Sequence, residues 1–112
     1  MEVEIHWSTL AKRQLRDVGQ YVAENFGERT AIKTLDSISK KVERLYRFPE
    51  SGCYDKKYST KSYTVRHLIL HPNLVYYIQE EKRITIMAVV HERQSPKTIS
   101  AMILRFVEHH IG

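Results

Sequence analysis

The sequence has little of the residues that mark disulfide-rich, fibrous or disordered chains. Its 112 residues include one cysteine, four glycines and three prolines. The single cysteine, Cys53, cannot form an internal disulfide or a cysteine-rich zinc site, which excludes disulfide-stapled secreted scaffolds and points to a reducing compartment. Because 42% of the residues are hydrophobic, the chain has enough apolar side chains for a core. These proportions predict one globular domain over residues 1–112.

The sequence also lacks a long apolar run. Its first eight residues include Glu2 and Glu4, where a secretory signal would need a basic start followed by an apolar stretch. No later segment approaches the ~20 apolar residues of a membrane span. We therefore expect a cytoplasmic protein with no membrane partner.

Basic residues outnumber acidic ones by 18 to 13, and the excess lies in the second half of the chain. Residues 1–50 hold 9 basic and 8 acidic side chains, whereas residues 51–112 hold 9 and 5. The densest basic segment, residues 56–71, has no acidic residue. A surface of this kind predicts a polyanionic partner.

The first half of the chain favours a strand followed by two helices. Polar and apolar residues alternate over residues 2–8, which is typical of a short strand with one buried face. Ser8 or Thr9 can then cap a helix over residues 10–25, and Gly27 can end it.

A second amphipathic helix is predicted from about Glu28 to a point before Phe48-Pro49. Its apolar residues recur at steps of three and four: Ala31, Leu35, Ile38, Val42 and Leu45. Two amphipathic helices joined by two or three residues must fold back on each other as an antiparallel hairpin. One apolar side of this hairpin still needs a cover.

The second half of the chain supplies that cover. Residues 63–70, 73–79 and 83–91 are rich in β-branched and aromatic side chains, which predicts three antiparallel strands. Simple alternation along the last strand predicts that one set of residues forms its core face: Ile84, Ile86, Ala88 and Val90.

The C-terminal segment is predicted to be a helix. Ser95-Pro96 is typical of an N-cap followed by proline at the first helical position, and apolar residues then recur at helical spacing up to Val107. The longest irregular segment is the loop of residues 48–60, a length that is uncommon without a function. The fold class is α+β: an N-terminal strand and an antiparallel α-hairpin packed on a twisted antiparallel sheet, with a C-terminal helix.

Three residues are candidates for the catalytic groups of a metal-independent ribonuclease: Arg66, His91 and Arg93. Such an enzyme needs a base for the ribose hydroxyl, cations for the phosphate and an acid for the leaving oxygen. Alternation places His91 and Arg93 on the same side of the last strand, provided that Glu92 stays extended. The alternative is structural: Arg66 pairs with a carboxylate such as Glu80, and His91 packs at a strand end.

Lys56, Lys57 and Lys61 are candidates for nucleic-acid or target binding. Three tyrosines alternate with them and offer rings on which bases can stack: Tyr54, Tyr58 and Tyr63. The alternative is a solvated basic loop. The six histidines lack metal-ligand spacing, and no nucleophile elbow or glycine-rich phosphate loop is present, so we expect no metal and no cofactor.

The order and spacing of several short segments resemble the RelE/ParE superfamily of bacterial type II toxins. The similar segments span nearly the whole chain: the opening strand with Ser8, Leu10, Ala11 and Leu15; residues 21–23; Phe48 to Gly52; Tyr63 to Leu68; Val75 to Ile78; Ile84 to Ile86; and Val89 to Gln94. The resemblance implies a helical hairpin packed on a twisted antiparallel sheet, and a cognate antitoxin, which we expect to be acidic, that wraps the toxin.

The superfamily has two branches with different targets, and the resemblance does not decide between them. The long hairpin and the last strand, which leads through His91 and Arg93 to Pro96 and a helix, are more similar to ParE toxins. That similarity implies inhibition of DNA gyrase, with Arg66 and Arg93 as contacts or scaffold and the C-terminal helix with its basic neighbours as the recognition element.

Membership of the RelE branch would imply cleavage of mRNA on the ribosome. Arg66 and Arg93 would then stabilise the phosphate and His91 would be the general base or acid. Lys56, Lys57 and Lys61 would hold ribosomal or messenger RNA. A third interpretation is an inactive relative that keeps only its antitoxin-binding surface. The ParE-like interpretation is preferred.

Overall fold

The computed structural model describes residues 3–110. In chain order its elements are β1 (Glu4–Trp7), α1 (Thr9–Phe26), α2 (Glu28–Glu43), the 3-10 turn η1 (Arg44–Tyr46), β2 (Cys53–Tyr54), β3 (Thr64–Leu70), β4 (Asn73–Gln79), β5 (Arg83–His91) and α3 (Pro96–His110). The predicted helices, the predicted first strand and the three predicted antiparallel strands are all present, with bounds close to the expected ones. The two-residue strand β2, inside the segment expected to be irregular, was not predicted.

The strands form one sheet in the order β1-β5-β4-β3-β2. Neighbouring strands are antiparallel, except that β1 runs parallel to β5. The predicted α+β fold is therefore confirmed, and β1 joins the same sheet as one of its edges. No helix within residues 3–110 is long and apolar enough to cross a membrane.

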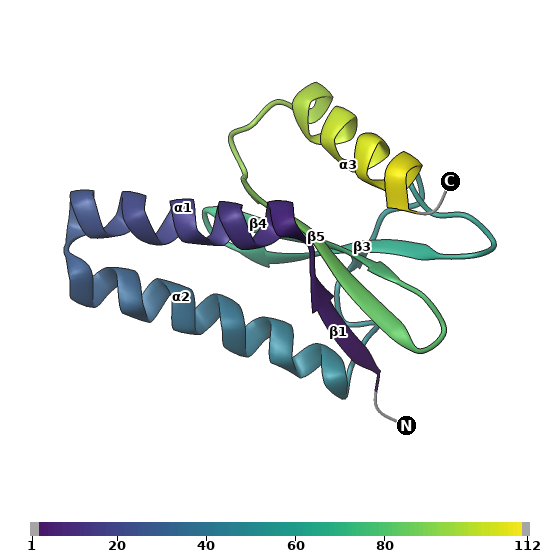
Figure 1. Ribbon diagram of the computed structural model, residues 1–112, viewed down its shortest axis with the longest axis horizontal. Coiled ribbons are helices and arrows are strands. Elements are labelled where there is room, and N and C mark those ends of the chain that lie inside the picture. Colours follow the sequence, from purple (N-terminus) through teal and green to yellow (C-terminus); the bar gives the residue numbers. More distant parts are fainter. Residues whose placement is uncertain (1–2, 111–112) are drawn as a thin grey trace.

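The helices α1 and α2 lie antiparallel and side by side as the predicted hairpin (Figure 1). A single residue, Gly27, separates them, and it has a φ of 96°. This backbone conformation is open to glycine and strained for other residues. Gly27 therefore ends α1 and begins α2 without a longer loop.

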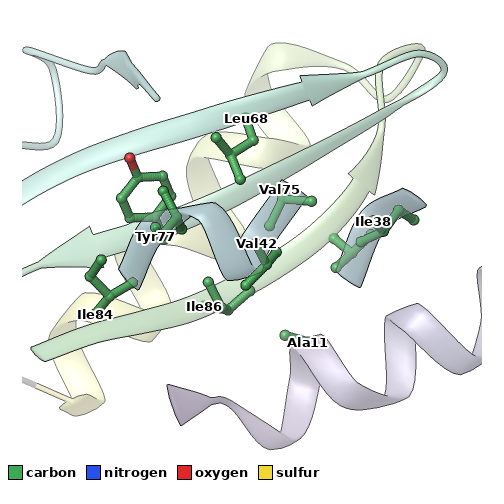
Figure 2. Close-up of a cluster of buried hydrophobic side chains, with 10 residues drawn as sticks. Ala11, Ile38, Val42, Leu68, Val75, Tyr77, Ile84 and Ile86 are labelled. Carbon is green, nitrogen blue, oxygen red and sulfur yellow. The ribbon is translucent and has the colours of Figure 1, made fainter. Parts of the chain in front are cut away.

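The helical hairpin covers one face of the sheet. Ala11 from α1 and Ile38 and Val42 from α2 meet apolar side chains of β3, β4 and β5 in a buried cluster (Figure 2). Tyr77 of β4 lies in this cluster with its ring among the aliphatic side chains, and its hydroxyl points away from them. This is the core that the helical periodicity predicts.

The opposite face of the sheet carries a second core under α3. Its helical members are Ile99 and Ile103, which are 7% and 1% exposed. The strand members come from β3, β4 and β5: Val65, Tyr76, Ile78, Met87, Ala88 and Val90. The side chain of Ser95 caps α3 by accepting a hydrogen bond from the Thr98 N–H at 3.1 Å. Both faces of β4 and β5 are therefore buried.

The prediction of a single core face along β5 is wrong, because a β-bulge interrupts the strand. Ala88 pairs with Tyr76 and Ile86 pairs with Tyr77, which leaves Met87 without a partner in β4. An extra residue of this kind shifts the alternation of the side chains that follow it. Ile84 and Ile86 consequently lie under the helical hairpin, whereas Ala88 and Val90 lie under α3.

Side chains at the start of α1 form hydrogen bonds with backbone groups at the bulge. The Ser8 hydroxyl donates to the carbonyl of Met87 at 2.8 Å and also accepts from the Ala11 N–H, capping α1. The side-chain oxygen of Gln14 accepts from the Val89 N–H at 2.8 Å. The N-cap and the first two turns of α1 thus hold the bulge.

Candidate functional site

Arg66, one of the predicted catalytic residues, is tied to the loop before β2. Its guanidinium donates to the Gln79 side-chain oxygen at 3.2 Å and to the carbonyls of Glu50 and Gly52 at 3.3 and 3.0 Å. It also lies 5.6 Å from the centre of the Tyr54 ring. The guanidinium of Arg66 therefore has structural partners, and its side-chain partner is Gln79 rather than the carboxylate that the structural alternative names.

The same loop is anchored by Tyr77. Its hydroxyl donates to the Pro49 carbonyl at 2.8 Å and accepts from the Gly52 N–H at 3.0 Å. Burial raises the pKa of Tyr77, so the phenol stays protonated and able to donate. A Cβ atom at Gly52 would lie 2.6 Å from this hydroxyl, so only glycine allows the close approach.

Replacing Tyr77 by Phe is expected to destabilise the protein by about 1–3 kcal/mol. The change leaves the Gly52 N–H and the Pro49 carbonyl without their partner in a buried turn. Urea denaturation measures the free energy of unfolding. Tyr46→Phe is the control, because Tyr46 is 41% exposed; equal losses in the two variants would contradict the anchoring role.

His91 and Arg93 adopt a turn rather than a continued strand. The strand β5 ends at His91, and Glu92 and Arg93 form a turn, so the condition that Glu92 stays extended is not met. The Arg93 N–H donates to His91 Nδ1 at 3.0 Å, and the His91 N–H donates to the Gln94 side chain. The Nδ1 atom therefore acts as an acceptor, and the Arg93 side chain is exposed.

The structure does not bring Arg66 close to His91. The strands β3 and β5 lie on either side of β4, where Arg66 is opposite Tyr77 and His91 is opposite Asn73. Four residues along a strand correspond to about 13 Å. The three predicted catalytic residues thus form two separate groups.

The three candidate lysines lie between β2 and β3, and all are exposed. The Lys57 ammonium donates to the Ser100 hydroxyl of α3 at 3.1 Å and lies 5.5 Å from the centre of the Tyr58 ring. The Tyr58 hydroxyl is also hydrogen-bonded to Ser100. The segment between β2 and β3, which we call the basic loop, is therefore docked on the N-terminal half of α3.

A hydrogen bond between His67 and Asp55, which was not predicted from the sequence, holds this loop on the sheet. His67 Nδ1 lies 2.9 Å from a carboxylate oxygen of Asp55, and both side chains are mostly buried. The His67 ring also lies 5.1 Å from the ring of Tyr76. The pair follows from the short strand β2, where Cys53 is opposite His67, and two residues give no sequence signal of a strand.

Two open grooves lie outside this loop. The first, which we call the α3 groove, has a volume of about 740 Å³. Its lining combines the start of α1 with residues along most of α3: Leu10, Thr98, Ala101, Met102, Arg105, Phe106 and His109. The second, the hairpin groove, has about 890 Å³ between β1, α1, α2 and η1, and its apolar lining includes Ile5, Trp7 and Leu15. Among residues 3–110, no three potential metal-ligating side chains come together.

One protein family matches the sequence, and a solved structure matches the fold. The family described as ParE toxin of the type II toxin-antitoxin system parDE matches residues 5–96. A solved structure of the chromosomal ParDE TA system from P. aeruginosa contains a similar chain, with a TM-score of 0.66 and 20% sequence identity. The match covers 80% of this chain and 96% of that chain, and at this identity it shows a shared fold. No curated protein matches the sequence.

Proposed function

Because the chain belongs to the ParE toxin family of type II toxin-antitoxin systems, we propose that it arrests bacterial growth by inhibiting DNA gyrase. Gyrase inhibition is the activity that the ParE branch of the superfamily implies. The chain is a toxin of the type II class, and the choice between gyrase and the ribosome as its target is the part that we propose.

The hydrogen bonds of Arg66, together with its distance from His91, support gyrase rather than the ribosome as the target. Its guanidinium already has three hydrogen-bond acceptors and holds the loop before β2. It is also about 13 Å along the strands from His91. A phosphodiesterase needs its acid, base and cations within hydrogen-bond reach of a single phosphate. This separation disfavours a ribonuclease site built from these residues.

The outer surface of α3 is the proposed recognition element for gyrase. Lys97, Leu104 and Arg105 are exposed on this helix, and the Leu104 side chain is 53% exposed. Arg105 also lines the α3 groove beside apolar Met102 and Phe106. An apolar surface with cations at its rim is suited to a protein partner that presents apolar and acidic side chains.

A cognate acidic antitoxin is the proposed inhibitor of this toxin. The chain carries a net charge of +5. The hairpin groove offers apolar side chains of β1 and α1, with Lys12 and Arg47 also in its lining. A disordered acidic segment that orders in such a groove would bury apolar surface and neutralise the cations.

The second candidate function is ribosome-dependent mRNA cleavage. It is favoured by Lys56 and Lys57, which lie beside the tyrosine rings of a pocket, and Lys61 is exposed in the same loop. In this function His91 would be the general base or acid, and Arg93 would stabilise the phosphate. An inactive, antitoxin-binding relative is the third candidate.

The substitutions His91→Ala and Arg93→Ala separate the first two functions. Each variant is expected to arrest growth as strongly as the unchanged chain when it is induced without an antitoxin. The physical reason is that the proposed recognition surface lies on α3 rather than on this turn. Colony counts after induction measure the arrest. Loss of arrest in both variants, at unchanged protein levels, would contradict this expectation and favour the nuclease function.

A further inference from the structure

The strand β1 lies at one edge of the sheet, with β5 on its inner side (Figure 1). The N–H groups of Glu4 and Ser8 point inward and donate to carbonyls on the β5 side at 2.9 and 3.0 Å. Because successive backbone groups alternate in direction along a strand, the N–H and C=O groups of Ile5 and Trp7 point to the outer edge. Among the strands of residues 3–110, only β5 pairs with β1. The outer edge can therefore accept another strand.

The side chains of β1 form an apolar set and a charged set on opposite faces. Val3, Ile5 and Trp7 pack against the core under the helical hairpin. Glu4 and His6 lie on the other face, 3.8 Å from each other, and their side chains are 76% and 47% exposed. From Val3 to Trp7 the order is thus apolar, acidic, apolar, basic, apolar. The acidic and the basic residue are placed symmetrically about Ile5.

We propose that the outer edge of β1 pairs antiparallel with β1 of a second copy of this chain, about a two-fold axis at Ile5. In this register, Ile5 is opposite Ile5 of the second copy, and Val3 is opposite Trp7. Glu4 is opposite His6, and the symmetry forms this pair of opposite charges twice. The outward backbone groups of Ile5 and Trp7 then fall in hydrogen-bonded pairs. The inference goes beyond gyrase inhibition and does not depend on it.

The charges of β1 favour a second copy over an acidic segment as the added strand. An acidic strand would bring like charge beside Glu4, whereas a second copy presents an opposite charge to Glu4 and to His6. The two-fold axis also places both helical hairpins on the same face of the joined sheet. The apolar residues that β1 contributes to the hairpin groove, Ile5 and Trp7, would then lie beside those of the second copy and lose exposure to water.

Sedimentation of the purified chain from about 10 µM to about 1 mM tests this inference, because so short a pairing makes a weak dimer. We expect a monomer–dimer equilibrium. His6→Glu should raise the dissociation constant about tenfold, since it sets carboxylates opposite each other twice. Glu4→Lys combined with His6→Glu should restore it, because the opposite charges are then exchanged. Gln20→Glu, which adds the same charge at an exposed position of α1, should leave the dissociation constant unchanged.

Amide hydrogen exchange followed by NMR locates the interface. The amides of Ile5 and Trp7 should exchange more slowly as the concentration rises, whereas the Glu4 amide, which is bonded within the chain, should not change. A chain that stays monomeric at about 1 mM would overturn the proposal. So would a dimer in which His6→Glu has no effect or in which the two amides stay unprotected. A glutamate-rich peptide that protects both amides in a monomeric chain would also overturn it and assign the edge to a partner strand.

Discussion

Reversing two charges on α3, with Lys97→Glu and Arg105→Glu together, is expected to raise about 30-fold the concentration needed to half-inhibit purified gyrase. Both side chains are exposed on the proposed recognition helix, and opposed charges at an interface weaken association strongly. A plasmid supercoiling assay with increasing amounts of the chain measures this concentration. The fold should be unaffected, because neither side chain is part of a core.

A matched control carries the same change in net charge on another element. Arg29→Glu with Lys33→Glu alters two exposed residues of α2, far from α3 in the fold (Figure 1). This variant should inhibit gyrase nearly as well as the unchanged chain. An equal loss in the two double variants would show that total charge, rather than the surface of α3, determines the inhibition.

Replacing Ile103 by Asp is expected to destabilise the protein strongly. Ile103 is 1% exposed in the core between α3 and the sheet, so the new carboxylate would be buried without a partner at a cost of about 4 kcal/mol or more. A typical domain has only about 5–15 kcal/mol of stability. Thermal unfolding followed by circular dichroism measures the loss.

The adjacent residue supplies the control for this change. Leu104 is 53% exposed on the same helix, so Leu104→Asp should change the free energy of unfolding by about 0.5 kcal/mol or less. If both variants unfolded at the same temperature, α3 would not pack on the sheet in the way described.

Most of the fold could be predicted from the sequence, because its signals are local. Helical periodicity, the cap at Ser95 and the break at Gly27 each lie within a few residues of the structure they specify. The bulge at Met87 could not be predicted. It depends on Ser8 and Gln14, which are more than 70 residues away in the chain.

The candidate site was less predictable for the same reason. The sequence identifies Arg66 and His91 as suitable residue types, but their distance follows from the strand register of β4. The partners of Arg66 include two backbone carbonyls, which residue types cannot reveal.

The target of the toxin is tested most directly by inducing this chain without an antitoxin in a bacterium that carries a reporter plasmid. Plasmid topology and the 5′ ends of the translated reporter transcript are then measured in the same samples as growth slows. Gyrase inhibition predicts loss of negative supercoiling while the transcript stays intact. New cuts in the transcript at normal supercoiling, abolished by His91→Ala or Arg93→Ala, would contradict it.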